Sequence, residues 1–275
     1  MHHPDLEVPY AIIVMQLNCR QYSTQGKALI ILHGLFGSLS NWGWHSKQLA
    51  KTFAVYGLDL RNHGDSPHAN ALNYRVMADD VREFMRSAGI EECAFIGHSM
   101  GGKVAMQLAL SHPELLTRLM VVDIAPVAYP PATDGQMDVL AGMEAMEVEA
   151  LSSRKEAEQR LVATIEDEAT RKFVLTNLIR NEDGGYRWRL NLASIRDNYD
   201  RLREKPLLGE AFTKPTLFVK GALSNYIQVQ NEEEILDLFP RASVKTIMQA
   251  GHWLHAERPQ AFQKIATDFL LQDEN

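Results

Sequence analysis

The sequence predicts an α/β fold, in which a mostly parallel central sheet is flanked by helices and carries an inserted helical cap. Short apolar runs alternate with amphipathic helical patterns from residue 28 to residue 122, and again after residue 216. This alternation is typical of the crossover units that build parallel sheets. Residues 126–206 interrupt it with helical patterns alone. The length of 275 residues fits one large domain that carries an insertion.

Five apolar runs and the mixed segment 244–248 are the expected strands of the core. The continuous apolar character of the five runs, without alternation, is typical of strands that are buried on both faces of a sheet. Three amphipathic patterns are expected to cover this sheet, and residues 1–28 are expected to form an irregular or β-rich lead-in. The expected strands are 28–32, 53–58, 93–96, 119–122, 216–219 and 244–248, and the expected core helices are 74–88, 103–110 and 261–271.

The insertion begins with a Pro-rich turn and then follows the spacing of amphipathic helices. Its helical patterns are 137–146, 155–165, 168–180 and, after a Gly184-Gly185 turn, a last one that ends near residue 204. No pattern among them predicts a strand. We therefore expect an all-helical cap, residues 126–206, over the active-site end of a core made of residues 1–125 and 207–275.

Composition limits the partners and the location of the protein. The net charge of −7 opposes non-specific binding to nucleic acid or anionic membranes. No apolar run approaches the ~20 residues that cross a bilayer, so stable membrane insertion is not expected. Cys19 and Cys93 are expected to be reduced thiols, and no signal peptide is expected. These features predict a cytoplasmic protein. Its oligomeric state stays open, as does the choice between Met1 and Met15 as the native start.

Residues 97–101, Gly-His-Ser-Met-Gly, match the pattern G-x-S-x-G. The pattern alone is weak because Gly and Ser are common residues. Here, however, it follows an apolar strand run and opens a helix, which is the context of a nucleophile elbow. We therefore predict that Ser99 is a catalytic nucleophile. The alternative is a strand–helix turn with an incidental serine.

A serine nucleophile needs a base and an acid that orients the base. His252 follows the last expected strand, which is where such a base is expected. The usual acid position, after the strand 216–219, holds Ser224, and a serine cannot supply a negative charge. Asp123 ends another strand on the same rim of the sheet, so it is the preferred acid, with Ser224 as an auxiliary hydrogen-bond partner. The alternative role of Asp123 is a strand-end cap.

Acyl transfer also needs donors for the developing oxyanion. The backbone N–H of Met100, the residue after the nucleophile, is one expected donor. The second is expected in the loop after the strand 28–32, from Leu35 as first choice and Phe36 as second. His63 and His68 lie near acidic residues, but their spacing is not that of a metal site. We expect neither a metal nor a cofactor.

These motifs resemble the α/β-hydrolase superfamily, and especially the bacterial YbfF-type esterases, from about Met15 to the C-terminus. In that family a serine also replaces the late aspartate, and an aspartate stands in the Asp-Ile-Ala-Pro segment, which matches Ser224 and Asp123. The chain departs from the family at Ala222-Leu223, where Gly-Asn is usual. The matching segments are 33–38, 59–64, 97–102 with Lys103, 122–127, 188–191 and 251–257.

The resemblance implies a serine carboxylesterase or thioesterase with a small helical cap, which hydrolyses small acyl esters or acyl-CoA thioesters through an acyl-enzyme on Ser99. Met143, Trp188 and Arg189 of the cap are the predicted substrate-binding residues, with Arg187 or Arg189 available to an anionic leaving group. Two alternatives stay open: a lyase or carbon–carbon bond hydrolase on the same fold, and a catalytically silent binding protein. The sequence leaves the physiological substrate open.

Overall fold

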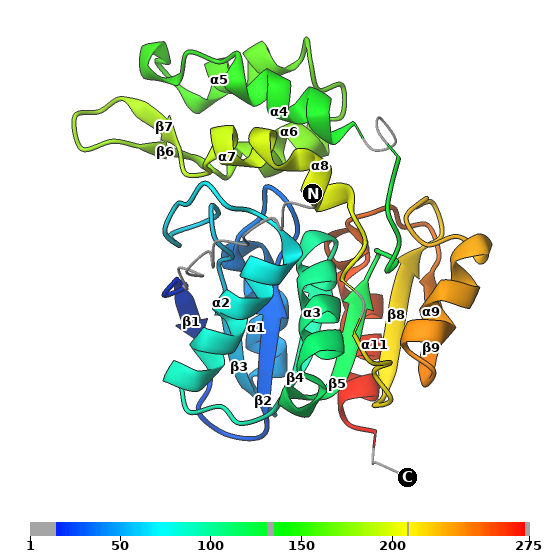
Figure 1. Ribbon diagram of the computed structural model, residues 1–275. Coiled ribbons are helices and arrows are strands. Elements are labelled where there is room, and N and C mark those ends of the chain that lie inside the picture. The colour runs from blue at the N-terminus through cyan, green and yellow to red at the C-terminus, as the bar shows by residue number, and fades with distance from the viewer. Residues whose placement is uncertain (1–14, 131–134, 208, 273–275) are drawn as a thin grey trace, which may run out of the picture.

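The computed structural model describes residues 15–130, 135–207 and 209–272 (Figure 1). Its central sheet has seven strands in the order β1-β3-β2-β4-β5-β8-β9. β1 is antiparallel to β3, and the other neighbouring strands are parallel. The predicted α/β class with a mostly parallel sheet is thereby confirmed. The strands are β1 Cys19–Gln21, β2 Ala28–Leu32, β3 Ala54–Leu58, β4 Cys93–His98, β5 Leu116–Val122, β8 Thr216–Gly221 and β9 Ala242–Ile247.

Helices cover both faces of this sheet and enclose two apolar cores. One core lies between the sheet and α2, α3 and α9, and the other lies between the sheet and α1 and α11. β4 is buried along its whole length, which explains why its sequence is apolar without alternation. The core helices are α1 Gly43–Leu49, α2 Tyr74–Ser87, α3 Met100–Ser111, α9 Glu232–Leu238, α10 Leu254–Glu257 and α11 Pro259–Leu270, with short 3-10 turns η1 Leu39–Trp42, η2 Pro113–Leu115 and η4 Val229–Asn231.

The residues between β5 and β8 form a separate layer at the carboxyl end of the parallel strands, seen above the sheet in Figure 1. Its elements come from one continuous stretch of sequence. They are α4 Gln136–Glu144, η3 Val148–Ala150, α5 Arg154–Leu161, α6 Glu168–Leu175, β6 Leu178–Arg180, β7 Tyr186–Trp188, α7 Leu192–Asp197 and α8 Tyr199–Arg203. We refer to this layer as the insertion.

The prediction that the insertion is all-helical was wrong. The helix expected over 168–180 ends at Leu175, and residues 178–180 pair with residues 186–188 as an antiparallel hairpin. The hairpin turn is closed by a hydrogen bond of 2.8 Å from Asn181 N to Gly185 O, and Gly184 adopts a φ of 92°. Such a conformation is readily available to glycine. The two glycines therefore mark a hairpin turn in this chain, and not the boundary between two helices.

Both ends of the insertion meet at one buried lysine of α3. The Lys103 ammonium donates hydrogen bonds to Val127 O at 2.9 Å, to Arg203 O at 3.3 Å and to Glu204 O at 2.5 Å. The two ends also bond to each other, from Tyr129 N to Arg203 O at 2.9 Å. The helix that follows the predicted nucleophile is thus bonded to the places where the chain enters and leaves the insertion.

Candidate active site

Ser99 stands in the turn between β4 and α3 with a φ of 51° and a ψ of −118°, a conformation that L-residues rarely adopt. Close packing requires glycine on either side of it. A Cβ on Gly97 would lie 2.4 Å from the carbonyl oxygen of Gly101, and a Cβ on Gly101 would lie 2.5 Å from that of His33. The turn leaves Ser99 at the carboxyl edge of the sheet, where it lines a cavity of about 310 Å³.

Asp123 directly follows β5 and is fully buried. One of its carboxylate oxygens, Oδ2, accepts a hydrogen bond of 2.8 Å from His252 Nδ1 and another from the Ser224 hydroxyl. The other oxygen, Oδ1, accepts a bond of 3.0 Å from Gly221 N. The structure thus brings together the three side chains that were predicted to supply the acid and the base. A carboxylate on Nδ1 keeps the proton there and leaves Nε2 of the imidazole free to act as a base.

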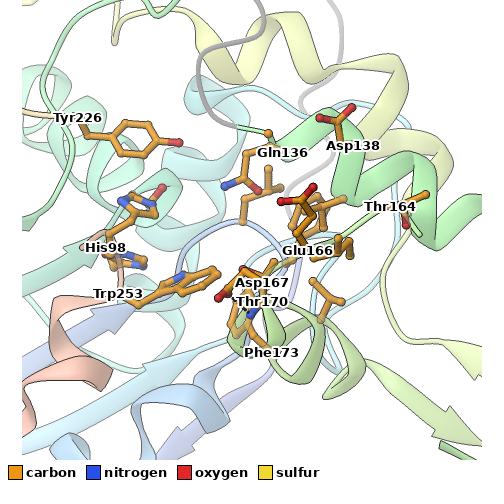
Figure 2. A pocket seen from close by; sticks show the side chains of 18 residues that line it. His98, Gln136, Asp138, Thr164, Glu166, Asp167, Thr170, Phe173, Tyr226 and Trp253 are labelled. Carbon is orange, nitrogen blue, oxygen red and sulfur yellow. Dashed lines mark hydrogen bonds between the residues drawn. The ribbon is translucent and has the colours of Figure 1, made fainter. Parts of the chain in front are cut away.

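His252 is held from several sides beside Ser99. It lines the same cavity as Ser99, and its own carbonyl accepts a hydrogen bond of 2.9 Å from His98 Nε2. The ring of Tyr226 lies 4.2 Å from the His252 ring, centroid to centroid. Figure 2 shows Tyr226 and His98 on the same side of the cavity. His252, the predicted base, is therefore supported both through its backbone and across its ring.

The supporting role of His98 was missed in the sequence, although His98 is a variable position of the G-x-S-x-G pattern. Its ring lies 4.7 Å from that of His255, which in turn stacks on Trp42 at 4.3 Å. Burial lowers the pKa of His98 well below its ordinary value, and lowers the pKa of His255 to about 3. A neutral His98 with its proton on Nε2 is the form that donates to the His252 carbonyl. No local sequence signal reports this contact, because the two residues lie 154 positions apart.

The loop after β2 lies against Ser99, the predicted nucleophile. A Cβ on Gly34 would come within 3.2 Å of the Ser99 Cβ, so the loop backbone passes next to the serine. Leu35 and Phe36 both line the cavity, but the Phe36 N–H donates to His63 Nε2 at 3.3 Å. The Phe36 N–H, the second choice for the oxyanion donor, is thus already used, and Leu35 remains the better candidate in this loop.

Met100 is the first residue of α3. The N–H groups of the first helical turn have no partner within their helix, and they carry the positive end of the helix dipole. The Met100 N–H is therefore available to an anionic oxygen near Ser99. Its position beside a second, smaller hollow, which Ser99 also lines, agrees with that role.

His63 is tied into the loop structure. It donates from Nδ1 to Arg61 O at 2.9 Å and accepts from Phe36 N at Nε2. Burial lowers its pKa to about 3, so the neutral form is the one held in this network. His68 instead bonds to the backbone oxygen of Arg189 at 3.0 Å. Among the residues that the structure describes, no group of three or more side chains could hold a metal ion.

The three cap residues predicted to bind substrate do not line the cavity. Met143 is fully buried, and its carbonyl oxygen accepts a hydrogen bond of 3.0 Å from Trp188 Nε1. Arg189 faces Asp65, with 3.7 Å between Nη1 and Oδ1. These side chains instead hold the insertion together and to the core. The chemical type of a residue does not indicate the direction in which its side chain points, so the sequence could not place these three side chains.

The insertion contributes a different set of residues to the cavity wall (Figure 2). Phe173, Val174, Val139 and Ile165 give it apolar surface. Three carboxylates, Asp138, Glu166 and Asp167, are exposed and also line it, which makes the outer wall acidic. The residues contributed by the insertion are Gly135, Gln136, Asp138, Val139, Thr164, Ile165, Glu166, Asp167, Thr170, Phe173 and Val174.

Comparison with known proteins places the chain in a family. Residues 27–259 match the family described as alpha/beta hydrolase fold. The chain is 39% identical over 251 residues to the sn-1-specific diacylglycerol lipase ABHD11 of Mus musculus, covering 88% of this chain and 80% of the relative. It is 32% identical over 260 residues to Esterase YbfF of Escherichia coli (strain K12), covering 93% of this chain and 99% of the relative.

A solved structure described as a marine microorganism esterase matches the fold with a TM-score of 0.91 at 40% sequence identity. The match covers 93% of this chain and 100% of that chain. Among the described residues, no helix is both long and apolar enough to span a bilayer. The matches to the family, to the two relatives and to the solved structure show that the chain is similar to esterases and to a lipase, and that it belongs to the α/β-hydrolase family.

Proposed function

We propose that the chain is a serine carboxylesterase that forms an acyl-enzyme on Ser99. The coarse class, a hydrolase acting on ester bonds, follows from its relatedness to esterases and lipases. The observation that carries the residue assignment is the hydrogen bond of 2.8 Å between His252 and the fully buried Asp123, at a cavity that Ser99 also lines. This is the arrangement that a general base for a serine hydroxyl requires.

In the first step, Ser99 Oγ attacks the ester carbonyl carbon while its proton passes to His252 Nε2. Asp123 stabilises the imidazolium that forms. The N–H groups of Leu35 and Met100 are the proposed donors to the tetrahedral oxyanion, and each such donor is worth about two to three orders of magnitude in rate. The C–O bond then breaks, and the imidazolium returns its proton to the leaving alcohol.

In the second step, a water molecule replaces the alcohol. His252 takes a proton from this water as its oxygen attacks the acyl carbon, and the bond to Ser99 Oγ breaks. The proton then returns to the serine oxygen. The products are one carboxylic acid and one alcohol, and Ser99, His252 and Asp123 end in their starting protonation states.

The charge of the cavity wall bears on the leaving group. The side chains of Asp138, Glu166 and Asp167 lie at the cavity, and like charges repel a polyanionic group such as the nucleotide of coenzyme A. Arg187 and Arg189, the cations that were expected to meet such a group, do not line the cavity. We therefore propose oxygen esters of uncharged alcohols as the favoured substrates, ahead of acyl-CoA thioesters. The cytoplasmic location stays a prediction.

The proposed function is tested by pre-steady-state hydrolysis of p-nitrophenyl acetate. We expect a burst of p-nitrophenol equal to the enzyme concentration, because the first step releases this activated leaving group faster than water hydrolyses the acyl-enzyme. Ser99→Ala should abolish the burst and lower kcat by up to about 10⁶-fold. The control Ser111→Ala, an exposed serine at the end of the same helix, should keep both. A burst that survives in Ser99→Ala would refute the assignment. Turnover of diketones without turnover of esters would favour the carbon–carbon hydrolase.

A further inference from the structure

Two hollows meet at Ser99. The larger, of about 310 Å³, is lined by His252 and Trp253. The smaller, of about 40 Å³, is lined by Met100, Ile124 and Leu202 and by none of the residues of the His252 loop. Ser99 lines both hollows. When an ester is bonded to the Ser99 oxygen, its acyl part and its alcohol part can therefore occupy different hollows.

The position of His252 determines which hollow holds the alcohol part of the ester and which holds the acyl part. During the first step the imidazolium must reach the oxygen of the leaving alcohol within hydrogen-bond distance. Only the larger of the two hollows is lined by His252, so the alcohol lies there. The acyl chain then extends away from His252, past the Met100 backbone and into the smaller hollow.

The smaller hollow has room for only a short chain. A water-sized group needs about 10–15 Å³ when volume is measured in this way, so about 40 Å³ holds about three such groups. That corresponds to the carbons beyond the carbonyl of an acetyl, propionyl or butyryl group. Ile124 and Leu202, which line this hollow, are almost fully buried and pack in the core.

Two of the four tyrosines that line this hollow, Tyr74 and Tyr129, are fixed by hydrogen bonds at their hydroxyl groups. The Tyr129 hydroxyl donates to Tyr226 O at 2.5 Å and accepts from Ala125 N at 2.9 Å. The Tyr74 hydroxyl donates to Leu202 O. A ring held at its hydroxyl cannot turn aside without losing a buried hydrogen bond, which is costly. A longer acyl chain would therefore have to displace walls that are already bonded.

We propose that the smaller hollow is the acyl subsite and that it selects esters with short acyl chains, while the larger cavity accepts a bulkier alcohol. Leu202, together with Ile124, sets the limit on acyl length. This inference rests on the proposed esterase function and extends it by naming the substrate class. Acyl length and alcohol bulk should therefore affect kcat/KM independently of each other.

The test compares p-nitrophenyl acetate, butyrate and octanoate, which share one leaving group. For the unmodified protein we expect kcat/KM to fall about ten- to a hundredfold from butyrate to octanoate, because overfilling a packed site is costly. Leu202→Ala removes an isopropyl group from the wall and should move the preference toward octanoate. Val139→Ala is the matched control, because Val139 lines only the larger of the two hollows, and it should leave the order of the acyl series unchanged.

A second series with the unmodified protein keeps the test valid if Leu202→Ala does not fold. Acetate esters of increasingly bulky alcohols should be hydrolysed with less than about tenfold change in kcat/KM. Hydrolysis that depends on Ser99 but favours octanoate, or a Leu202→Ala profile equal to that of the unmodified protein, would overturn the subsite alone. Hydrolysis that persists in Ser99→Ala would instead overturn the proposed esterase on which it rests.

Discussion

Asp123 accepts three hydrogen bonds although it has no exposed surface, from His252, Ser224 and the Gly221 backbone. A buried carboxylate is tolerated when its oxygens are satisfied in this way. The three donors do different things. In the proposed mechanism His252 makes the contact that takes part in catalysis, whereas Ser224 and Gly221 hold the carboxylate in place. This separation of roles predicts unequal effects of substitution.

Asp123→Asn should lower kcat by about 10⁴-fold, because an amide can donate to His252 Nδ1 and so favour the tautomer with the proton on Nε2. Ser224→Ala removes one charge-assisted hydrogen bond and leaves the other two, so a loss of only about tenfold is expected. Steady-state hydrolysis of one activated ester measures both. If Ser224→Ala lowered kcat as much as Asp123→Asn does, Ser224 would be as necessary as Asp123 for orienting His252.

Single residues were predictable where local geometry demands them. The glycines at 97 and 101 are read from the sequence because the carbonyl oxygens around the elbow leave no room for a Cβ. His98 was not predicted as a support, because its partner is a backbone carbonyl that only the folded chain brings near. The hydrogen bond from Phe36 N to His63 Nε2 was not predicted either, because it joins two loops that only the folded chain brings together.

At the scale of the elements, α3 links Ser99, the proposed nucleophile, to the insertion. Its first turn follows Ser99, and its Lys103 bonds both ends of the insertion. The ammonium also lies 4.8 Å from the centroid of the Tyr129 ring and 5.4 Å from that of Tyr74. A cation over aromatic rings is stabilised electrostatically. The Lys103 side chain therefore holds the insertion against α3, the helix that follows Ser99.

Lys103→Met should loosen the ends of the insertion, because it removes the charge and leaves three carbonyl oxygens without this donor. Hydrogen exchange should become faster in residues 126–130 and 202–206 and stay unchanged in β4. The stability loss should be about 1–3 kcal/mol, because Val127 O and Glu204 O lose this donor while Arg203 O keeps its bond from Tyr129 N. Lys51→Met, at an exposed lysine, is the control. Equal protection of both segments in the two variants would contradict the role of Lys103.

The elements of the core were easier to predict than those of the insertion. A buried parallel strand is a continuous apolar run whichever helix covers it, and the five apolar runs of the sequence overlap strands of the sheet. The mixed segment 244–248 overlaps β9, an edge strand that is mostly exposed. In the insertion, β6 and β7 are short, with three residues each. Three residues are too few to establish an alternating pattern, so the helix predicted over 168–180 extended past Leu175 into the hairpin.

For the whole molecule, the order of the strands explains how residues far apart in sequence meet. Ser99, Asp123 and Ser224 follow β4, β5 and β8, and His252 comes after β9. These strands are consecutive neighbours in the sheet and run parallel, so the residues that follow them gather at one edge. The sequence predicted this meeting. The acidic wall of the cavity was not predicted, because it depends on how the insertion lies above that edge.

For the whole molecule, we propose that the fold makes Ser99 the residue that is covalently acylated. The direct measurement is mass spectrometry of the intact protein and of its peptides after reaction with an organophosphonate that carries a short alkyl group. We expect one adduct per chain, located on the peptide that contains Ser99, and no adduct in Ser99→Ala. An adduct on another residue, or labelling that continues in Ser99→Ala, would contradict the assignment of Ser99 as the nucleophile.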